Sequence, residues 1–228
     1  MTLQGSIIHS RWPPVNPTAP HHAPPSGQER EVRAVRIDAR ERRQRIIDAA
    51  CDLFRTTHPS EVTMDRVAER AGVGIATLYR NFPDRQALTR HCTLYLLEVV
   101  QRIQSDALAR FAADPDHAER TWRRFVSDLV ELGTGALVPA LAPSSMRELG
   151  PEGVPHRAAV RKHTQAILRA AAAHRLVSPE LAAHEFVTQL SVLTRPPIAG
   201  VTRLNPEVTA QLVEGYLDHQ RELGRARA

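Results

Sequence analysis

Apolar side chains recur at intervals of three and four residues along most of the chain, which is the spacing of one face of an α-helix. In residues 38–57 the apolar positions with this spacing are Ile46, Ile47, Ala50, Leu53 and Phe54. Polar residues fall on the opposite face, namely Arg42, Arg45, Asp48 and Asp52. No segment shows sustained apolar-polar alternation bounded by an Asn-Gly or Asp-Gly turn, as a β-hairpin would. The pattern predicts an all-α protein.

Prolines and short polar residues that can cap a first turn set the ends of the predicted helices. Asp114-Pro115, Ser178-Pro179 and Asn205-Pro206 each place a capping residue before a proline at the first helical position. Thr63 and Asp84 supply two further caps. We expect helices over residues 38–57, 64–71, 75–81, 84–112, 115–135, 155–176, 179–195 and 206–223, with a short one near 138–147.

The pattern divides the chain into three regions. The first 28 residues hold six prolines between positions 13 and 25 and show no helical period, and we predict a disordered, Pro/Arg-rich tail over residues 1–37. Residues 38–90 contain three short apolar stripes that can close over one small core, followed by the start of a long helix. Residues 91–228 contain longer helices, which predicts a larger helical domain.

The segment Ala71-Gly72-Val73-Gly74 joins the second and third predicted helices. Gly72 can take the left-handed conformation that ends a helix, and Val73 can then point inward. Ala68 is small enough to let the two helices approach closely, and Leu78 can anchor the third helix on the core. This spacing is the helix-turn-helix arrangement.

Composition excludes several classes of protein. The 228 residues are 42% hydrophobic and 24% charged, as in a soluble globular protein. The longest apolar runs, residues 94–100 and 136–141, are too short to cross a bilayer, so we expect no membrane partner. Two cysteines cannot build a disulfide framework, and no secretion signal is visible, so the cytoplasm fits best.

The net charge of +5 is concentrated in the first part of the chain. Residues 1–90 hold fourteen arginines against ten acidic residues, whereas residues 91–228 have sixteen basic against fifteen acidic residues. Lys162 is the only lysine, so almost all positive charge is guanidinium, which pairs well with phosphate and with guanine. Charge alone leaves two interpretations open: a nucleic-acid partner, or a bias in composition.

Residues 40–90 closely resemble the N-terminal signature of the TetR family of bacterial transcriptional regulators. The matching segments are Arg45-Ile46-Ile47-Asp48-Ala49-Ala50 with Leu53-Phe54, Thr63-Met64-Asp65-Arg66-Val67-Ala68, Ala71-Gly72-Val73, Thr77-Leu78-Tyr79-Arg80-Asn81-Phe82 and Leu88. The resemblance implies a helix-turn-helix DNA-binding domain over residues 38–90 and a dimeric helical ligand-binding domain over residues 91–228.

The resemblance also implies roles for individual residues. The third helix would enter the major groove and present Ile75, Ala76, Thr77, Arg80 and Asn81 to DNA, with Gly74 at its start. Arg80 is the candidate for a guanine contact, whereas the apolar positions can meet thymine methyl groups. Thr63, Tyr79 and Arg85 match phosphate-contacting positions. For Tyr79 the alternative is a packed aromatic side chain, and for Thr63 it is a helix cap alone.

Two positions depart from the family pattern. His58 stands where the pattern has the glycine that closes the first helix, and Pro59 follows it, so we expect a rebuilt corner. Gly74 stands where a serine is usual, which removes one hydroxyl contact to phosphate. The basic stretch between Arg30 and Arg43 can be either a solvated helix face or an arm that follows DNA.

The second domain is less informative. Its apolar stripes fit a solid core or a ligand cavity, and the resemblance favours a cavity for an unidentified small-molecule effector. His163, His184 and Gln189 are polar residues that could orient a ligand there, but each one singly is better explained as a surface residue or a satisfied core residue, so the ligand-binding residues stay unknown. The last two predicted helices could form the homodimer face, through Leu181, Phe186, Leu190 and Val192 and through Val208, Leu212, Val213 and Tyr216.

We therefore predict a sequence-specific DNA-binding regulator, a repressor that a small-molecule ligand releases from a palindromic double-stranded DNA operator. No motif of an enzyme, a nucleotide cofactor or a metal site is present, so we expect no catalysis, no cofactor and no metal. The alternative is a helical ligand-binding or interaction protein whose helix-turn-helix no longer binds DNA.

Overall fold

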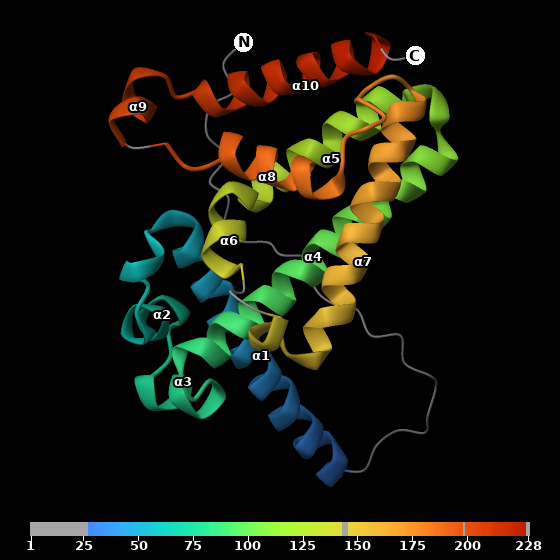
Figure 1. Ribbon diagram of the computed structural model, residues 1–228. Helices are drawn as coiled ribbons and strands as arrows, with labels where there is room; N and C mark the ends of the chain where they lie inside the picture. Colours follow the sequence, from blue (N-terminus) through green and yellow to red (C-terminus); the bar gives the residue numbers. More distant parts are fainter. Residues whose placement is uncertain (1–26, 143–145, 198, 227–228) are drawn as a thin grey trace. The chain divides into compact units, whose positions relative to one another are not determined.

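The computed structural model describes residues 27–142, 146–197 and 199–226, and within them it contains helices and turns but no strand. This confirms the all-α prediction (Figure 1). The helices are α1 (Gly27–Thr56), α2 (Met64–Ala71), α3 (Ile75–Asn81), α4 (Arg85–Ala113), α5 (Ala118–Leu132), α6 (Thr134–Leu141), α7 (Met146–Ala173), α8 (Ala183–Leu193), α9 (Ala199–Leu204) and α10 (Val208–Ala226), with 3-10 turns η1 (Pro59–Glu61) and η2 (Pro115–His117).

The described residues from Arg40 onward form one compact unit, and residues 27–39 belong to another. Helix α1 begins at Gly27 rather than near residue 38, so residues 27–37 of the expected tail are helical. The remainder of that tail, residues 1–26, lies outside the described residues. All contacts discussed below lie within the unit that starts at Arg40.

Local capping rules predicted some helix starts and missed others. Thr63 caps α2 by accepting the Arg66 N–H at 3.3 Å, and Asp84 caps α4 by accepting the Ala87 N–H at 2.7 Å. Ser178-Pro179 does not start a helix: the Ser178 hydroxyl accepts the Glu180 N–H at 3.3 Å, but residues 179–180 form a turn. Helix α8 begins later, at Ala183, with the Glu185 carboxylate accepting the Ala182 N–H at 3.0 Å.

Two other proline-containing starts are also displaced. Pro115 opens the 3-10 turn η2, and α5 begins only at Ala118. The Asn205 side chain accepts the Glu207 N–H at 3.1 Å, and α10 begins at Val208. Helix α7 is longer than expected, because helical residues continue on both sides of a kink at Gly150, whose φ is 75°.

Helix α4 contributes to two cores. Near its start, Leu88 and Cys92 are buried with the side chains of α1, α2 and α3 that close the helix-turn-helix core, among them Ile46, Phe54, Val67, Leu78 and Phe82. Near its end, Ala107 and Phe111 join the larger core of α5, α7, α8 and α10. Helix α4 therefore belongs to both helix groups.

Three aromatic rings lie at the centre of the larger core. The Phe186 ring on α8 lies 5.5 Å from the Trp122 ring and 6.0 Å from the Phe125 ring, measured between centroids, and both partners come from α5. Leu181 and Leu190 are buried in the same core. Phe186, Leu181 and Leu190 are therefore not available for the predicted dimer face, which the apolar period could not distinguish from the core face.

Helices α4 and α7 run side by side and are joined by buried polar contacts (Figure 1). The Gln104 amide donates to the Thr164 hydroxyl at 2.8 Å and to the Val160 carbonyl at 3.0 Å. Gln104 is 1% exposed and Thr164 is 2% exposed. Because buried polar groups are costly to leave unpaired, these bonds fix the register of the two helices.

Gly135 on α6 permits a close approach to the end of α8. A Cβ atom at Gly135 would lie 2.2 Å from the carbonyl carbon of Thr194, so the backbones must separate to admit it. We expect Gly135→Ala to lower the free energy of unfolding by roughly 1–3 kcal/mol, as overpacking does. Urea unfolding at fixed protein concentration measures the change.

Gly215→Ala is the matched control, since a Cβ atom there meets nothing within 4 Å. It replaces a glycine inside α10, so stability should rise by about 0.5 kcal/mol. Equal stabilities of the two variants would contradict the close approach at Gly135.

Candidate nucleic-acid interface

The turn between α2 and α3 has the geometry that the sequence predicts. Gly72 is left-handed, with φ 64° and ψ 37°, and its N–H lies 3.1 Å from the Glu69 carbonyl. The Val73 N–H donates to the Ala68 carbonyl at 3.0 Å. These bonds close α2 in a single turn, and no atom crowds Gly72. Its positive φ, rather than lack of space, is what requires glycine there.

Helix α3 has a buried side and an exposed side. We call α1, α2, α3 and the first turns of α4 the head. Leu78 and Phe82 are 0% exposed and anchor α3 on the core of this head. Ile75 is 39% exposed and Tyr79 is 48% exposed, although both are large hydrophobic residues. The candidate contact residues Gly74, Ala76 and Arg80 are exposed with them, whereas Thr77 and Asn81 are half-buried at the edges.

The polar side chains of α3 bond to their own helix. The Arg80 guanidinium donates to the Thr77 hydroxyl at 2.9 Å and to the Ala76 carbonyl at 3.3 Å. The Asn81 amide donates to the Thr77 carbonyl at 2.8 Å. Arg80 is exposed, so it can exchange these bonds for contacts to a ligand. Tyr79 is not the packed aromatic of the alternative interpretation, because its side chain is almost half exposed.

Arg43 on α1 holds the end of α3. Its guanidinium donates to the Asn81 carbonyl at 2.9 Å and lies 4.3 Å from the centroid of the Phe82 ring. It also lies 2.6 Å from Nε2 of His91 on α4. His91 Nδ1 faces the Ala87 carbonyl at 2.8 Å, so Nδ1 carries the proton and Nε2 accepts from Arg43. Partial burial lowers the pKa of Arg43.

Arg85, a candidate phosphate contact, supports the corner between α1 and α2. Its guanidinium donates to the Pro59 carbonyl at 2.6 Å and to the Val62 carbonyl, and it lies 5.7 Å from the Phe54 ring centroid. At this corner His58 is extended, and its Nδ1 accepts the Ser60 N–H at 3.4 Å. The corner that a glycine usually closes is formed here by His58 and the 3-10 turn η1, and Arg85 ties this corner to the start of α4.

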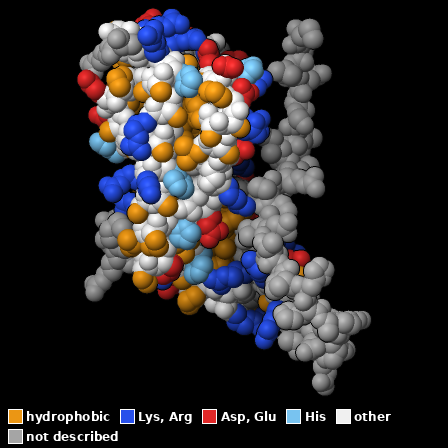
Figure 2. Space-filling view, turned by 90° about the vertical axis from the view of Figure 1, so that its right-hand side faces the viewer, with side chains coloured by type: hydrophobic (Ala, Val, Ile, Leu, Met, Phe, Trp, Pro, Cys, Tyr) orange, Lys and Arg blue, Asp and Glu red, His pale blue; other side chains and the backbone are white. Residues whose placement is uncertain are grey.

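Basic side chains are not confined to the helix-turn-helix. Figure 2 views the molecule from the right-hand side of Figure 1 and shows basic side chains scattered over that face among hydrophobic and acidic ones. Within the described ranges no group of three or more His, Cys, Asp or Glu residues could hold a metal ion. No helix in the same ranges combines the length and apolarity that crossing a bilayer needs.

Comparison with known proteins agrees with the geometry of the helix-turn-helix. Residues 46–92 match the family model described as bacterial regulatory proteins, tetR family. The crystal structure of the TetR transcription regulatory protein from Mycobacterium vanbaalenii is 26% identical and superposes with a TM-score of 0.50, covering 79% of this chain and 98% of that one. Residues 46–92 are therefore similar to the DNA-binding segment of the TetR family.

The curated relatives of this chain carry regulator names. An uncharacterised HTH-type transcriptional regulator of Mycobacterium tuberculosis is 31% identical over 130 residues, which are 47% of this chain and 63% of the relative. An HTH-type regulator of Staphylococcus aureus is 43% identical over 54 residues, which are 24% of this chain and 29% of the relative. The crystal structure of a TetR transcriptional regulator from Streptomyces coelicolor is 24% identical and superposes with a TM-score of 0.51. The superposition covers 78% of this chain and 98% of that chain, so the two share the fold.

These names describe regulators and not enzymes, in agreement with the prediction from the sequence. The match to the Mycobacterium tuberculosis relative spans less than two thirds of that protein. The match to the family model covers the helix-turn-helix and the first turns of α4. Arg43 lies just before the matched residues and contacts α3 within them, through the Asn81 carbonyl.

Arg43→Ala removes the donor to the last turn of α3. We expect the free energy of unfolding to fall by roughly 1.5–3 kcal/mol, the range for hydrogen bonds made by a charged group. Chemical unfolding gives the value. Arg45→Ala is the control, because Arg45 is exposed on the same helix and should change stability by less than about 0.5 kcal/mol. Equal losses in the two variants would show that Arg43 does not hold α3.

Proposed function

We propose that the chain is a dimeric, sequence-specific DNA-binding regulator, acting as a repressor that a small molecule releases from a palindromic operator. The observation that carries the proposal is the two-sided character of α3. Its buried residues fix it on the head, while Ile75, Tyr79 and Arg80 face solvent. Neighbouring apolar and aromatic side chains that are exposed together are typical of an interaction site.

In this proposal the roles divide between base readout and positioning. Arg80 contacts a guanine edge, and the apolar side chains of Ile75 and Ala76 meet thymine methyl groups. Tyr79 and Thr63 contact phosphates, and the Thr63 hydroxyl also caps α2. Arg85 places its guanidinium beside the corner carbonyls and contributes positive charge there. Gly74, Thr77 and Asn81 complete the surface at the two ends of α3.

A homodimer follows from the symmetry of a palindromic operator. Among the residues expected at the dimer face, Val192 on α8 is 70% exposed and Leu212 on α10 is 48% exposed. Leu204 on α9 is 89% exposed. Helices α8 and α10 contact each other, so these side chains come from neighbouring elements of the fold. They support a dimer face that is narrower than the sequence pattern suggested.

An effector acts in this proposal through the second core. Of the three polar candidates, His184 and Gln189 are exposed, whereas Nδ1 of His163 is buried without a hydrogen-bond partner among the described residues. Trp122 Nε1 and Gln104 Oε1 are buried in the same condition. A ligand that pairs with such atoms favours one arrangement of α4 and α7. It releases DNA if that arrangement places the reading heads at the wrong spacing.

Selection of bound sites from random duplexes tests the function directly. The full chain should enrich an inverted repeat whose half-sites lie about 34–36 Å apart or a multiple of this, since two α3 helices then enter successive major grooves. Enrichment of one half-site alone would argue against a dimer. Failure to enrich any sequence at low ionic strength would favour the alternative of a helix-turn-helix that no longer binds DNA.

Arg80→Ala and Tyr79→Phe should separate base readout from positioning. Arg80→Ala should relax base preference at one position in each half-site by about 1–3 kcal/mol, whereas Tyr79→Phe should weaken all sequences similarly. Titrations of the selected site and of single-base variants, at one fixed salt concentration, measure both effects. A uniform loss for Arg80→Ala across all these duplexes would remove Arg80 from base readout.

A further inference from the structure

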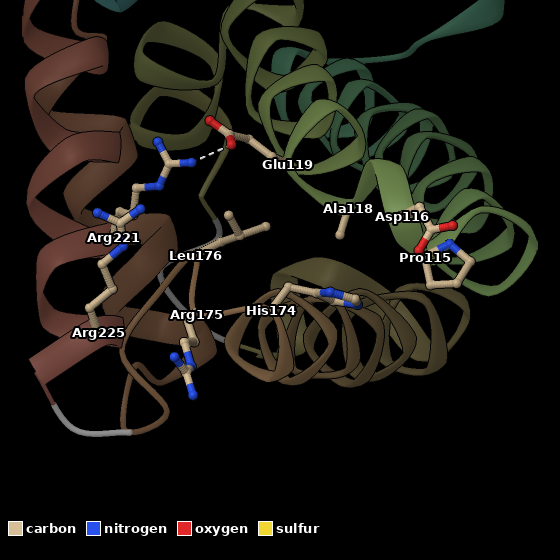
Figure 3. A pocket seen from close by; sticks show the side chains of 9 residues that line it. All are labelled: Pro115, Asp116, Ala118, Glu119, His174, Arg175, Leu176, Arg221 and Arg225. Carbon is tan, nitrogen blue, oxygen red and sulfur yellow. Dashed lines mark hydrogen bonds and ion pairs between the residues drawn. The ribbon is translucent and has the colours of Figure 1, made fainter.

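A pocket of about 550 Å³ opens where the beginning of α5, the end of α7 and the end of α10 meet (Figure 3). Its wall includes three arginines, Arg175 after α7 and Arg221 and Arg225 on α10. The apolar part of the wall includes Leu176 and Ala118, which belong to the larger core and are 6% and 4% exposed. The volume lies in the range that holds a small organic molecule.

The positive charge of this pocket is only partly neutralised. Arg221 forms an ion pair with Glu119, and that carboxylate is shared with Arg123 at 3.3 Å. Arg175 and Arg225 make no ion pair or side-chain hydrogen bond within the part of the chain that is described. Asp116 is the other carboxylate of the wall and is exposed. Arg221 and Arg225 repel each other, being four residues apart on one helix face.

The backbone around the pocket is tightly specified. Arg175 has a φ of 58°, a left-handed conformation normally taken by glycine after a helix. The Leu176 N–H donates to the Ala171 carbonyl at 3.0 Å, which holds that turn. Gly224 of α10 lies against the same turn, since a Cβ atom there would be 3.0 Å from the Arg175 carbonyl oxygen and 2.6 Å from that of Val177.

This close packing sets the positions of the α10 arginines. Residues 221 and 225 lie on either side of Gly224 along α10, so the contact at Gly224 brings both to the α7 turn. In Figure 3 the Arg221 side chain reaches toward Glu119, whereas the Arg175 guanidinium points away from that ion pair toward the rim. The turn thus places a left-handed arginine, Arg175, beside Arg225, and neither has an ion pair in the described part of the chain.

We propose that this pocket binds a small organic anion. Its carboxylate or phosphate group is held by Arg225 with Arg221 and Arg175, and its apolar part lies against Leu176 and Ala118. Guanidinium groups bind both kinds of oxyanion through paired N–H donors. All residues of the pocket wall follow α4 in the chain, whereas α3 precedes α4. The 29 residues of α4 therefore separate the pocket from the DNA-reading helix along the sequence. The proposal therefore does not rest on DNA binding.

Thermal unfolding of the full chain with four probes tests the pocket, without DNA. Phenyl phosphate and benzoate supply the two anionic groups on one apolar ring. Benzyl alcohol is the neutral control, and inorganic phosphate is the control without an apolar part. Phenyl phosphate, benzoate or both should raise Tm by several degrees at saturation, while both controls should change Tm by less than a degree. The more effective anion assigns the ligand's charged group.

Variants then connect the binding to the arginines. Arg225→Gln should weaken the effective anion at least tenfold, as measured by calorimetric titration. Arg169→Gln is the control, because Arg169 is exposed on α7 away from the pocket wall and should leave affinity within twofold. Arg175→Gly should raise Tm without ligand and weaken the anion at least threefold, because it relieves the left-handed strain and removes one guanidinium.

Opposite changes in Tm and affinity at Arg175 distinguish a ligand contact from a purely structural residue. The proposal is overturned if neither phenyl phosphate nor benzoate raises Tm. It is also overturned by an equal rise with either control, since the charge or the apolar surface would then play no part. Unchanged affinity in Arg225→Gln also overturns it, whatever the selection experiment on duplexes shows.

Discussion

The burial of the two ends of α4 in two different cores is the constraint on which this structure depends. The helix runs without interruption from Arg85 to Ala113, and no linker divides the head from the larger core. Its first turns place Leu88 and Cys92 in the head, and its last turns place Phe111 beside α5 and α7. An apolar side chain exposed by a shift of α4 would cost about 1.5–3 kcal/mol, so the helix cannot leave either core cheaply.

Polar contacts at the head strengthen this attachment. Tyr95 on α4 hydrogen-bonds with Asp48 on α1, and Gln44 donates to the same carboxylate at 3.0 Å. Burial is the main reason why the pKa of Asp48 and the pKa of Tyr95 are raised. Helix α3 benefits because, at seven residues, it is too short to be stable alone. Leu78, Phe82 and Arg43 hold α3 in place, so the side chains on its exposed face are not needed to stabilise it.

The features that sequence predicted are those fixed by neighbouring residues. The left-handed Gly72 and the caps Thr63 and Asp84 each depend on a few residues of local chain, and all three are present. The Arg43 contact joins residues 38 positions apart, and nothing in the local pattern marks it. The sequence predicts Ser178 as a helix cap, and its hydroxyl does accept the Glu180 N–H, but the chain turns there and α8 begins only at Ala183. Apolar periodicity also could not say whether Leu190 faces the core or a second subunit.

Helix α7 connects the two ends of this architecture. Near its start, the Arg90 guanidinium of α4 donates to the Glu148 carbonyl at 3.2 Å, and after its last turn lies Arg175. Between them Gln104 holds α4 to α7 through two buried hydrogen bonds. Sliding one helix along the other would leave the Gln104 amide unpaired, at a cost of about 1–3 kcal/mol. In the proposed function, a ligand that acts on α7 would therefore also act on α4, and α4 carries the helices that hold α3.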